Sequence, residues 1–130
     1  MIVLDTNILV WLTTSPENIS PLALKMINKF KTRKELYVSS ISAWEIALLV
    51  KKKRLLFNIG FEEWLLKVKN LTFLKFVDVD VDIAVASVNL KWTHKDPADR
   101  FIVATALNLE AKLITSDRKI LTFKGVQSIW

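Results

Sequence analysis

The chain of 130 residues contains no cysteine, two glycines and a single histidine, His94. Without cysteine it can form no disulfide, thiolate nucleophile or cysteine-ligated zinc site. A metal-free ribonuclease that uses two imidazoles as acid and base is excluded, unless a second copy supplies one of them. With two glycines the chain has neither a dinucleotide-binding fingerprint nor a P-loop, which disfavours nucleotide cofactors of those types.

Long apolar runs are missing as well. No stretch approaches the roughly 20 apolar residues that a membrane span requires. The first residues, Met1 to Asp5, include no basic segment and reach a carboxylate almost at once. We therefore expect neither a secretory signal nor a membrane anchor. The lack of cysteine is compatible with the reducing cytoplasm, which is the location we expect.

The composition indicates a folded, basic protein. Hydrophobic residues make up 52% of the chain and charged residues 25%, and the length suits one domain over residues 1–130. Nineteen basic residues against 13 acidic ones give a net charge of +6 at pH 7. Such a surface attracts polyanions, most commonly nucleic acid, although many proteins are basic without binding one.

Short apolar runs alternate with helical patterns along the chain. The predicted strands are Ile2–Leu4, Leu36–Val38, Phe73–Val79, Leu113–Thr115 and Val126–Ile129. Helices are predicted at Ile8–Leu12, after the cap Ser20 as far as Phe30, at Ser42–Lys53, at Phe61–Val68, at Val81–Val88, from Asp96 to Leu109, and at Asp117–Leu121. Strands that alternate with helices need crossover connections. The pattern predicts an α/β fold in three layers, α/β/α, around a mostly parallel central sheet.

Four carboxylates stand where predicted helices begin: Asp5, Glu45, Asp99 and Asp117. Each has a structural explanation taken singly. Asp5 and Asp117 are good N-cap residues, and the segment from Ser42 to Glu45 matches a capping box. Asp99 lies in the favourable first turn of a helix that Asp96 caps.

Their joint arrangement favours a metal site. Asp5 and Asp117 follow strands, so in a parallel sheet both lie at the carboxyl edge, where ligands of α/β sheets bind. Two carboxylates about 5 Å apart repel each other by roughly 3 kcal/mol at an effective dielectric constant near 20. A hard divalent cation, Mg²⁺ or Mn²⁺, relieves this repulsion and prefers oxygen ligands. Such an ion activates water for attack on a phosphodiester.

At these residues the chain resembles the PIN-domain ribonucleases, in particular the VapC-like toxins of type II toxin–antitoxin modules. The matching segments are Leu4–Asn7, Ser39–Ile46, His94–Arg100 and Thr115–Asp117. Their order and spacing hold along essentially the whole chain. The resemblance implies a PIN-like fold and a metal-dependent endoribonuclease.

The resemblance also implies particular roles and partners. It makes Asp5, Glu45, Asp99 and Asp117 the catalytic, metal-binding acids, with Mg²⁺ or Mn²⁺ as cofactor. It makes Thr6, Asn7 and Ser116 supporting residues that form hydrogen bonds at the site. It further implies an RNA substrate, a VapB-like antitoxin that inserts a peptide over the acidic pocket, and a homodimer. Arg100 and His94 receive no role.

Two other functions are weighed against the ribonuclease. A receiver-like phosphoacceptor domain would also bind Mg²⁺ and would use Asp78 or Asp80 as acceptor, but the segment from Ser42 to Glu45 has no place in it. A non-catalytic RNA-binding or antitoxin-binding module is disfavoured because all four acids are present.

Surface groups leave further alternatives open. The basic segments Lys29–Lys34 and Lys51–Arg54 either follow an RNA backbone or are solvated helix ends. Trp11, Trp64 and Trp92 are candidate interface residues, and we expect at least two of them to lie in the core.

Overall fold

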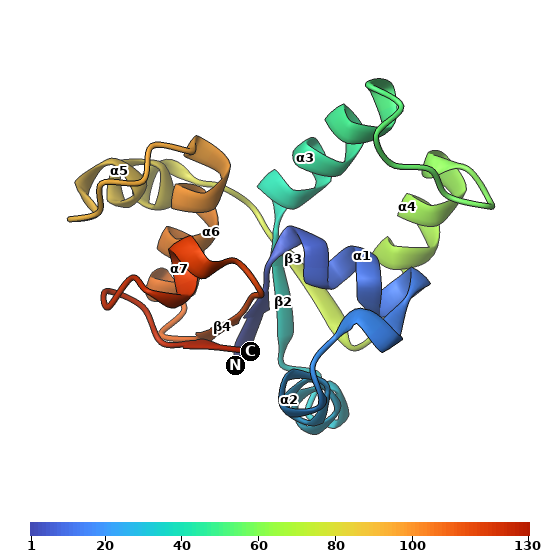
Figure 1. Ribbon diagram of the computed structural model, residues 1–130, viewed down its shortest axis with the longest axis horizontal. Helices are drawn as coiled ribbons and strands as arrows, with labels where there is room; N and C mark the ends of the chain where they lie inside the picture. Colours follow the sequence, from blue (N-terminus) through green and yellow to red (C-terminus); the bar gives the residue numbers. More distant parts are fainter.

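The computed structural model describes residues 1–130, and its centre is a five-stranded sheet (Figure 1). All neighbouring strands are parallel, in the order β3-β2-β1-β4-β5. The strands are β1 (Ile2–Leu4), β2 (Leu36–Ser39), β3 (Leu74–Val77), β4 (Lys112–Ile114) and β5 (Ser128–Ile129). The predicted α/β class with a mostly parallel sheet is therefore confirmed.

Helices cover both faces of this sheet. They are α1 (Thr6–Thr14), α2 (Pro21–Thr32), α3 (Ser40–Lys51), α4 (Phe61–Lys69), α5 (Val81–Asn89), α6 (Pro97–Asn108) and α7 (Arg118–Leu121), with one 3₁₀ turn, η1 (Pro16–Asn18). In Figure 1, α1 to α4 lie on one side of the strands and α5 to α7 on the other. None of the helices combines the length and the apolar character that crossing a lipid bilayer would take.

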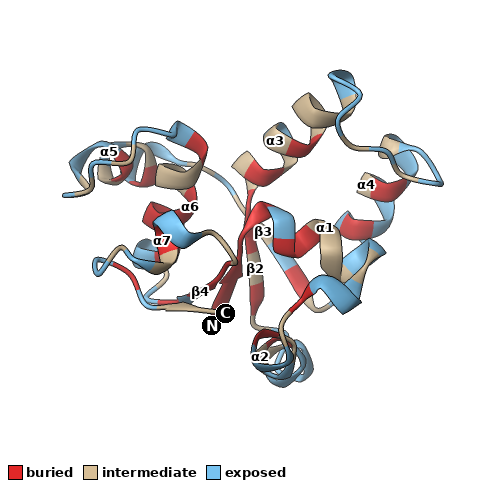
Figure 2. Ribbon diagram, viewed as in Figure 1, coloured by how far each residue is buried: buried red, intermediate tan, exposed pale blue.

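The strand β1 shows why the sheet is buried on both faces. Ile2 and Leu4 point into the apolar cluster beneath α1 to α4, and Val3 points into the cluster beneath α6 and α7. All three side chains are fully buried, which Figure 2 shows for the central strands. A parallel strand with a helix layer on each face needs such an uninterrupted apolar run.

Two helices differ from the sequence-based expectation in ways that affect the site. The helix expected to begin at Ser42 begins at Ser40, with Ser39 as its N-cap. The predicted capping box is therefore wrong: Ser42 lies inside α3 and is fully buried. In the same way α1 begins at Thr6, directly after Asp5. Asp5 therefore directly precedes its helix, and Glu45 lies in the second turn of α3 and not in the first.

Candidate active site

The four predicted acids lie at the carboxyl edge of the sheet, on four different elements. Asp5 directly follows β1 and caps α1, and Asp117 follows the neighbouring strand β4 and caps α7. Glu45 lies in the second turn of α3, which leaves directly from the end of β2 (Figure 1). Asp99 lies in the first turn of α6, which packs against α3. Parallel strands bring these segments together because all of their carboxyl ends meet at one edge.

Asp5 is the most deeply placed of the acids, with 6% of its surface exposed. Its Oδ1 accepts the backbone N–H of Thr6 at 2.7 Å, and its Oδ2 accepts the hydroxyl of Thr115 at 2.6 Å. Burial raises the pKa of Asp5 to about 6, against the lowering effect of these two hydrogen bonds. Its carboxyl is thus held in one orientation by two donors.

Glu45 is held by the adjacent helix. Its Oε1 accepts the hydroxyl of Thr6 at 2.6 Å, and the oxygen of that hydroxyl lies 2.8 Å from Oγ of Ser42. Since Thr6 has one hydroxyl hydrogen and gives it to Glu45, Ser42 donates to Thr6. Burial raises the pKa of Glu45 to about 7, opposed by the Thr6 bond and assisted by the charges of Asp5 and Asp99. Thr6 therefore connects two of the acids.

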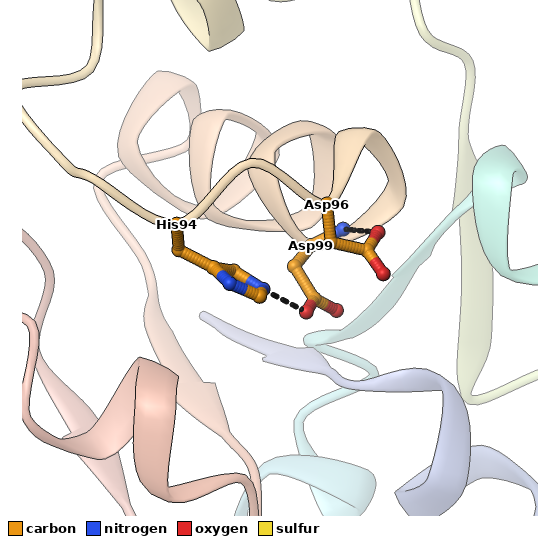
Figure 3. A group of neighbouring side chains, drawn as sticks. All are labelled: His94, Asp96 and Asp99. Carbon is orange, nitrogen blue, oxygen red and sulfur yellow. Dashed lines mark hydrogen bonds and ion pairs between the residues drawn. The ribbon is translucent and has the colours of Figure 1, made fainter.

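Asp99 has a histidine as its partner. Its Oδ2 lies 2.6 Å from Nε2 of His94, while its backbone N–H donates to Oδ1 of Asp96 at 3.3 Å (Figure 3). Each of these three residues offers one atom that could bind a metal ion, and the three atoms lie within 4.8 Å of one another. Burial raises the pKa of Asp99, and the hydrogen bond with His94 opposes the rise. Asp96 caps α6 as expected and is exposed.

Asp117 joins the same hydrogen-bonded chain through its backbone. Its N–H donates to Oγ1 of Thr115 at 3.0 Å, and Thr115 donates in turn to Asp5. Its own Oδ1 accepts the N–H of Lys119 at 2.9 Å, which is a helix cap. Capping and participation in the cluster are therefore compatible at this residue.

No lysine or arginine neutralises the negative charge of the cluster, and His94 is the basic side chain that contacts it. Asp99 and Asp117 both act to raise the pKa of Asp5, which shows that the acids lie within electrostatic reach of one another. None of the four predicted acids forms an ion pair with a lysine or an arginine. Partly buried carboxylates that no lysine or arginine neutralises are the donor set that a hard divalent ion fits. The acidic cluster can therefore bind a metal.

Of the three residues predicted to support the site, one forms hydrogen bonds with the acids. Thr6 bonds to the site as expected. Asn7 is exposed, and neither its side chain nor that of Ser116 bonds to another residue of the chain, so the supporting role of both stays a prediction. Two residues that were not predicted also form hydrogen bonds at the site: Thr115 donates to Asp5, and Ser42 donates to Thr6. The register of the strands could have identified Thr115, because the pairing of Leu4 with Ile114 places Asp5 beside Thr115.

Arg100, to which the sequence assigned no role, organises the neighbouring loop. Its guanidinium donates to five backbone carbonyls at 2.8–3.2 Å. The acceptors are Ser87, Val88, Leu90, Trp92 and His94. Arg100 thus holds the end of α5 and the loop that carries His94 against α6.

The acids considered for a receiver-like domain lie elsewhere. Asp78 and Asp80 follow β3, which is the edge strand of the sheet, and both are exposed. Asp80 accepts the N–H of Ile83 and caps α5. A phosphoacceptor would be needed after the middle strand, so these residues do not suit that function.

Comparison with known proteins agrees with this arrangement. The sequence profile of the PIN domain matches residues 2–126. The chain is 30% identical over 120 residues to Ribonuclease VapC22 of Mycobacterium tuberculosis, an alignment that covers 92% of this chain and 88% of that protein.

Solved structures show the same fold. DNA-bound VapBC from Salmonella typhimurium matches with a TM-score of 0.70 and 19% identity, covering 98% of this chain and 96% of the other. VapBC2 from Rickettsia felis, bound to a promoter DNA fragment, matches with a TM-score of 0.72 and 18% identity, covering 99% and 98%. Taken with the profile match over almost the whole chain and the edge of acids that the fold assembles, these likenesses show that the chain belongs to the PIN-domain family.

Proposed function

We propose that this chain is a metal-dependent endoribonuclease and the toxin of a type II toxin–antitoxin pair. The observation that carries the proposal is the acidic cluster at the sheet edge, which is partly buried and has no lysine or arginine partner. Its relative is named a ribonuclease, and the structural neighbours are named complexes of VapB and VapC proteins.

In this proposal Asp5, Glu45, Asp99 and Asp117 hold Mg²⁺ or Mn²⁺. A bound ion of this kind lowers the pKa of a coordinated water and neutralises charge that develops on a phosphate. The chain's own contribution is orientation. Thr115 and the backbone of Thr6 fix the two oxygens of Asp5, and the Thr6 hydroxyl fixes one oxygen of Glu45. Ligands held in this way lose little freedom when the ion binds.

Partners and location follow as parts of the same proposal. The substrate is RNA, which the net charge of +6 attracts. A VapB-like antitoxin covers the acidic pocket with a peptide segment, and two copies of the chain form a homodimer in the cytoplasm. A cytoplasmic location agrees with the absence of cysteine.

The test is the substitution Asp99→Asn, which preserves the shape of the side chain and removes one metal-binding charge. Purified protein is incubated with cellular RNA in Mn²⁺ or in EDTA. We expect the unaltered protein to cleave in Mn²⁺ alone and the variant to lose at least about a hundredfold in rate, the scale on which a misplaced metal ligand acts. Equal cleavage by a folded variant would reject the assignment, and tight RNA binding without turnover would favour a non-catalytic module.

A further inference from the structure

A groove leads away from the acidic cluster along α3. Its volume is about 290 Å³, and it begins at Glu45 and Asp96 and ends at Lys52 and Arg54. Trp44 lies along it. A second hollow, of about 400 Å³ beside Trp64, contains no carboxylate. The groove along α3 connects with the proposed metal site because Glu45 lines it.

Trp44 differs from every other tryptophan of the chain. It is 58% exposed, whereas Trp64 is 4% exposed and Trp11, Trp92 and Trp130 are half-buried. Each of those four rings contacts another aromatic ring, and Trp44 contacts none. An exposed indole without a partner offers a free aromatic face to a ligand.

The far end of the groove has unpaired positive charge. Lys52 and Arg54 are exposed and form no ion pair. Trp44, Leu48 and Lys52 are spaced at four-residue intervals, which places them on one face of the helical segment over about 12 Å at 1.5 Å per residue. Trp44 thus lies beside Glu45 at the acidic end of this face, and the two cations lie at the other end.

We propose that this groove binds a nucleotide of single-stranded RNA next to the phosphodiester at the acidic cluster. The base stacks on Trp44, and Lys52 and Arg54 bind the phosphates that lead away from the site. This inference rests on the proposed ribonuclease function and adds a subsite to it. Stacking on an aromatic ring combined with a basic track is how proteins bind single strands without reading their sequence.

The experiment measures binding of fluorescein-labelled octauridylate and octaadenylate by anisotropy, in Mg²⁺. The Asp99→Asn protein serves as the background so that the RNA stays intact. Trp44→Leu should weaken binding of both oligonucleotides about tenfold, which is within the range for loss of one stacked base. Trp44→Phe should recover most of the affinity because phenylalanine keeps an aromatic face. Leu66→Ala, at an exposed apolar residue of α4, is the matched control and should change nothing.

A second experiment compares a lysine that lines the groove with a neighbouring lysine that does not. Lys52 lines the groove, whereas Lys51 is exposed in the same helix turn but does not line it. Lys52→Ala should weaken binding and lower the slope of log affinity against log salt by about one. Lys51→Ala should have a clearly smaller effect, although the change in net charge is identical.

Three results would overturn the subsite. One is unchanged RNA affinity in Trp44→Leu, and another is equal losses in Lys51→Ala and Lys52→Ala. The third is a change of oligomeric state in sedimentation of Trp44→Leu at constant RNA affinity, which would make the groove an interface between copies. If the Trp44→Leu substitution in the unaltered chain leaves Mn²⁺-dependent cleavage intact at full RNA affinity, the subsite fails and the ribonuclease stands. If the unaltered protein neither binds nor cleaves RNA, the proposed function fails as well.

Discussion

Two threonine hydroxyls orient the acids of the cluster. Thr115 is fully buried and donates to Asp5, and Thr6 donates to Glu45. A hydrogen bond to a charged acceptor contributes about 1.5–3 kcal/mol, and its loss leaves the acceptor desolvated. These hydroxyls therefore matter both to stability and to the charge of the acids.

Thr115→Val tests this at the residue that the sequence missed. Valine has nearly the same shape but no hydroxyl, so Asp5 loses a donor that stabilises its ionised form. The pKa of Asp5 should rise further, and the ascending limb of the pH profile of RNA cleavage should move to higher pH. Urea unfolding at pH 7 should show a loss of about 1–3 kcal/mol.

The control for this variant is Thr105→Val, because Thr105 is equally buried and donates within its own helix to the carbonyl of Phe101. It should lower stability without moving the pH profile. A profile that stays in place in Thr115→Val would show that the Thr115 hydroxyl does not act on Asp5.

At the scale of elements, Arg100 connects α5, α6 and the loop between them. Five carbonyl oxygens accept from one guanidinium, including the last carbonyls of α5, which have no partner within their own helix. The loop that Arg100 holds brings His94 to Asp99. One side chain therefore stabilises a helix junction and positions a partner of the site.

Arg100→Lys keeps the charge but replaces a planar fork of five donors with a single ammonium. We expect a loss of about 2–3 kcal/mol in the free energy of unfolding, because several carbonyls lose a charged donor. Urea unfolding measures it. Arg33→Lys, at an exposed arginine in the turn after α2, should stay within about 0.5 kcal/mol. A loss no larger in Arg100→Lys than in Arg33→Lys would contradict the role assigned to the guanidinium.

Helices and strands were predicted well from the sequence where a short apolar run or a capping residue determines them. The apolar run of β1 and the cap-and-proline start of α2 after Ser20 gave the right elements at the right places. The start of α3 was misplaced because Ser39, Ser40 and Ser42 all suit a cap, and only the position of β2 selects Ser39. In α5 the spacing of valines gave the helix but not its buried side: Val81, Val85 and Val88 are exposed, and Ile83 is buried.

The sequence predicted that the four acids converge and that Thr6 bonds to them, but not the other hydrogen-bond partners of the acids. Residues at strand ends converge whatever the details of packing, so a parallel topology was enough to group the carboxylates. The bonds from Thr115, Ser42 and His94 depend on strand register and loop path. Neither of these is encoded in a local pattern.

For the whole molecule, the acidic cluster has a cost in stability that depends on pH. The folded protein binds the Asp5 proton more tightly than the unfolded chain, because burial raises its pKa from 3.8 to about 6. Between these values the unfolded state loses its proton first, so stability falls as the pH rises. At about 1.4 kcal/mol per unit of pKa, Asp5 contributes a loss of about 3 kcal/mol above pH 6.

Urea unfolding in EDTA between pH 4 and pH 7.5 measures this loss. Glu45, with its pKa raised to about 7, acts in the same direction, so the free energy of unfolding should fall across this range. Asp5→Asn should flatten the curve. A variant as steep as the unaltered protein would show that Asp5 is not the source.

We infer that acids distant in the sequence share a pocket that a divalent cation stabilises. Urea unfolding at pH 7.5 with increasing Mn²⁺, for the unaltered protein and for Asp99→Asn, tests this most directly. We expect Mn²⁺ to stabilise the unaltered protein by about 2.7 kcal/mol at a hundred times the dissociation constant, and the variant far less. An unfolding curve of the unaltered protein that does not move with Mn²⁺, or an equal shift in both proteins, would contradict it.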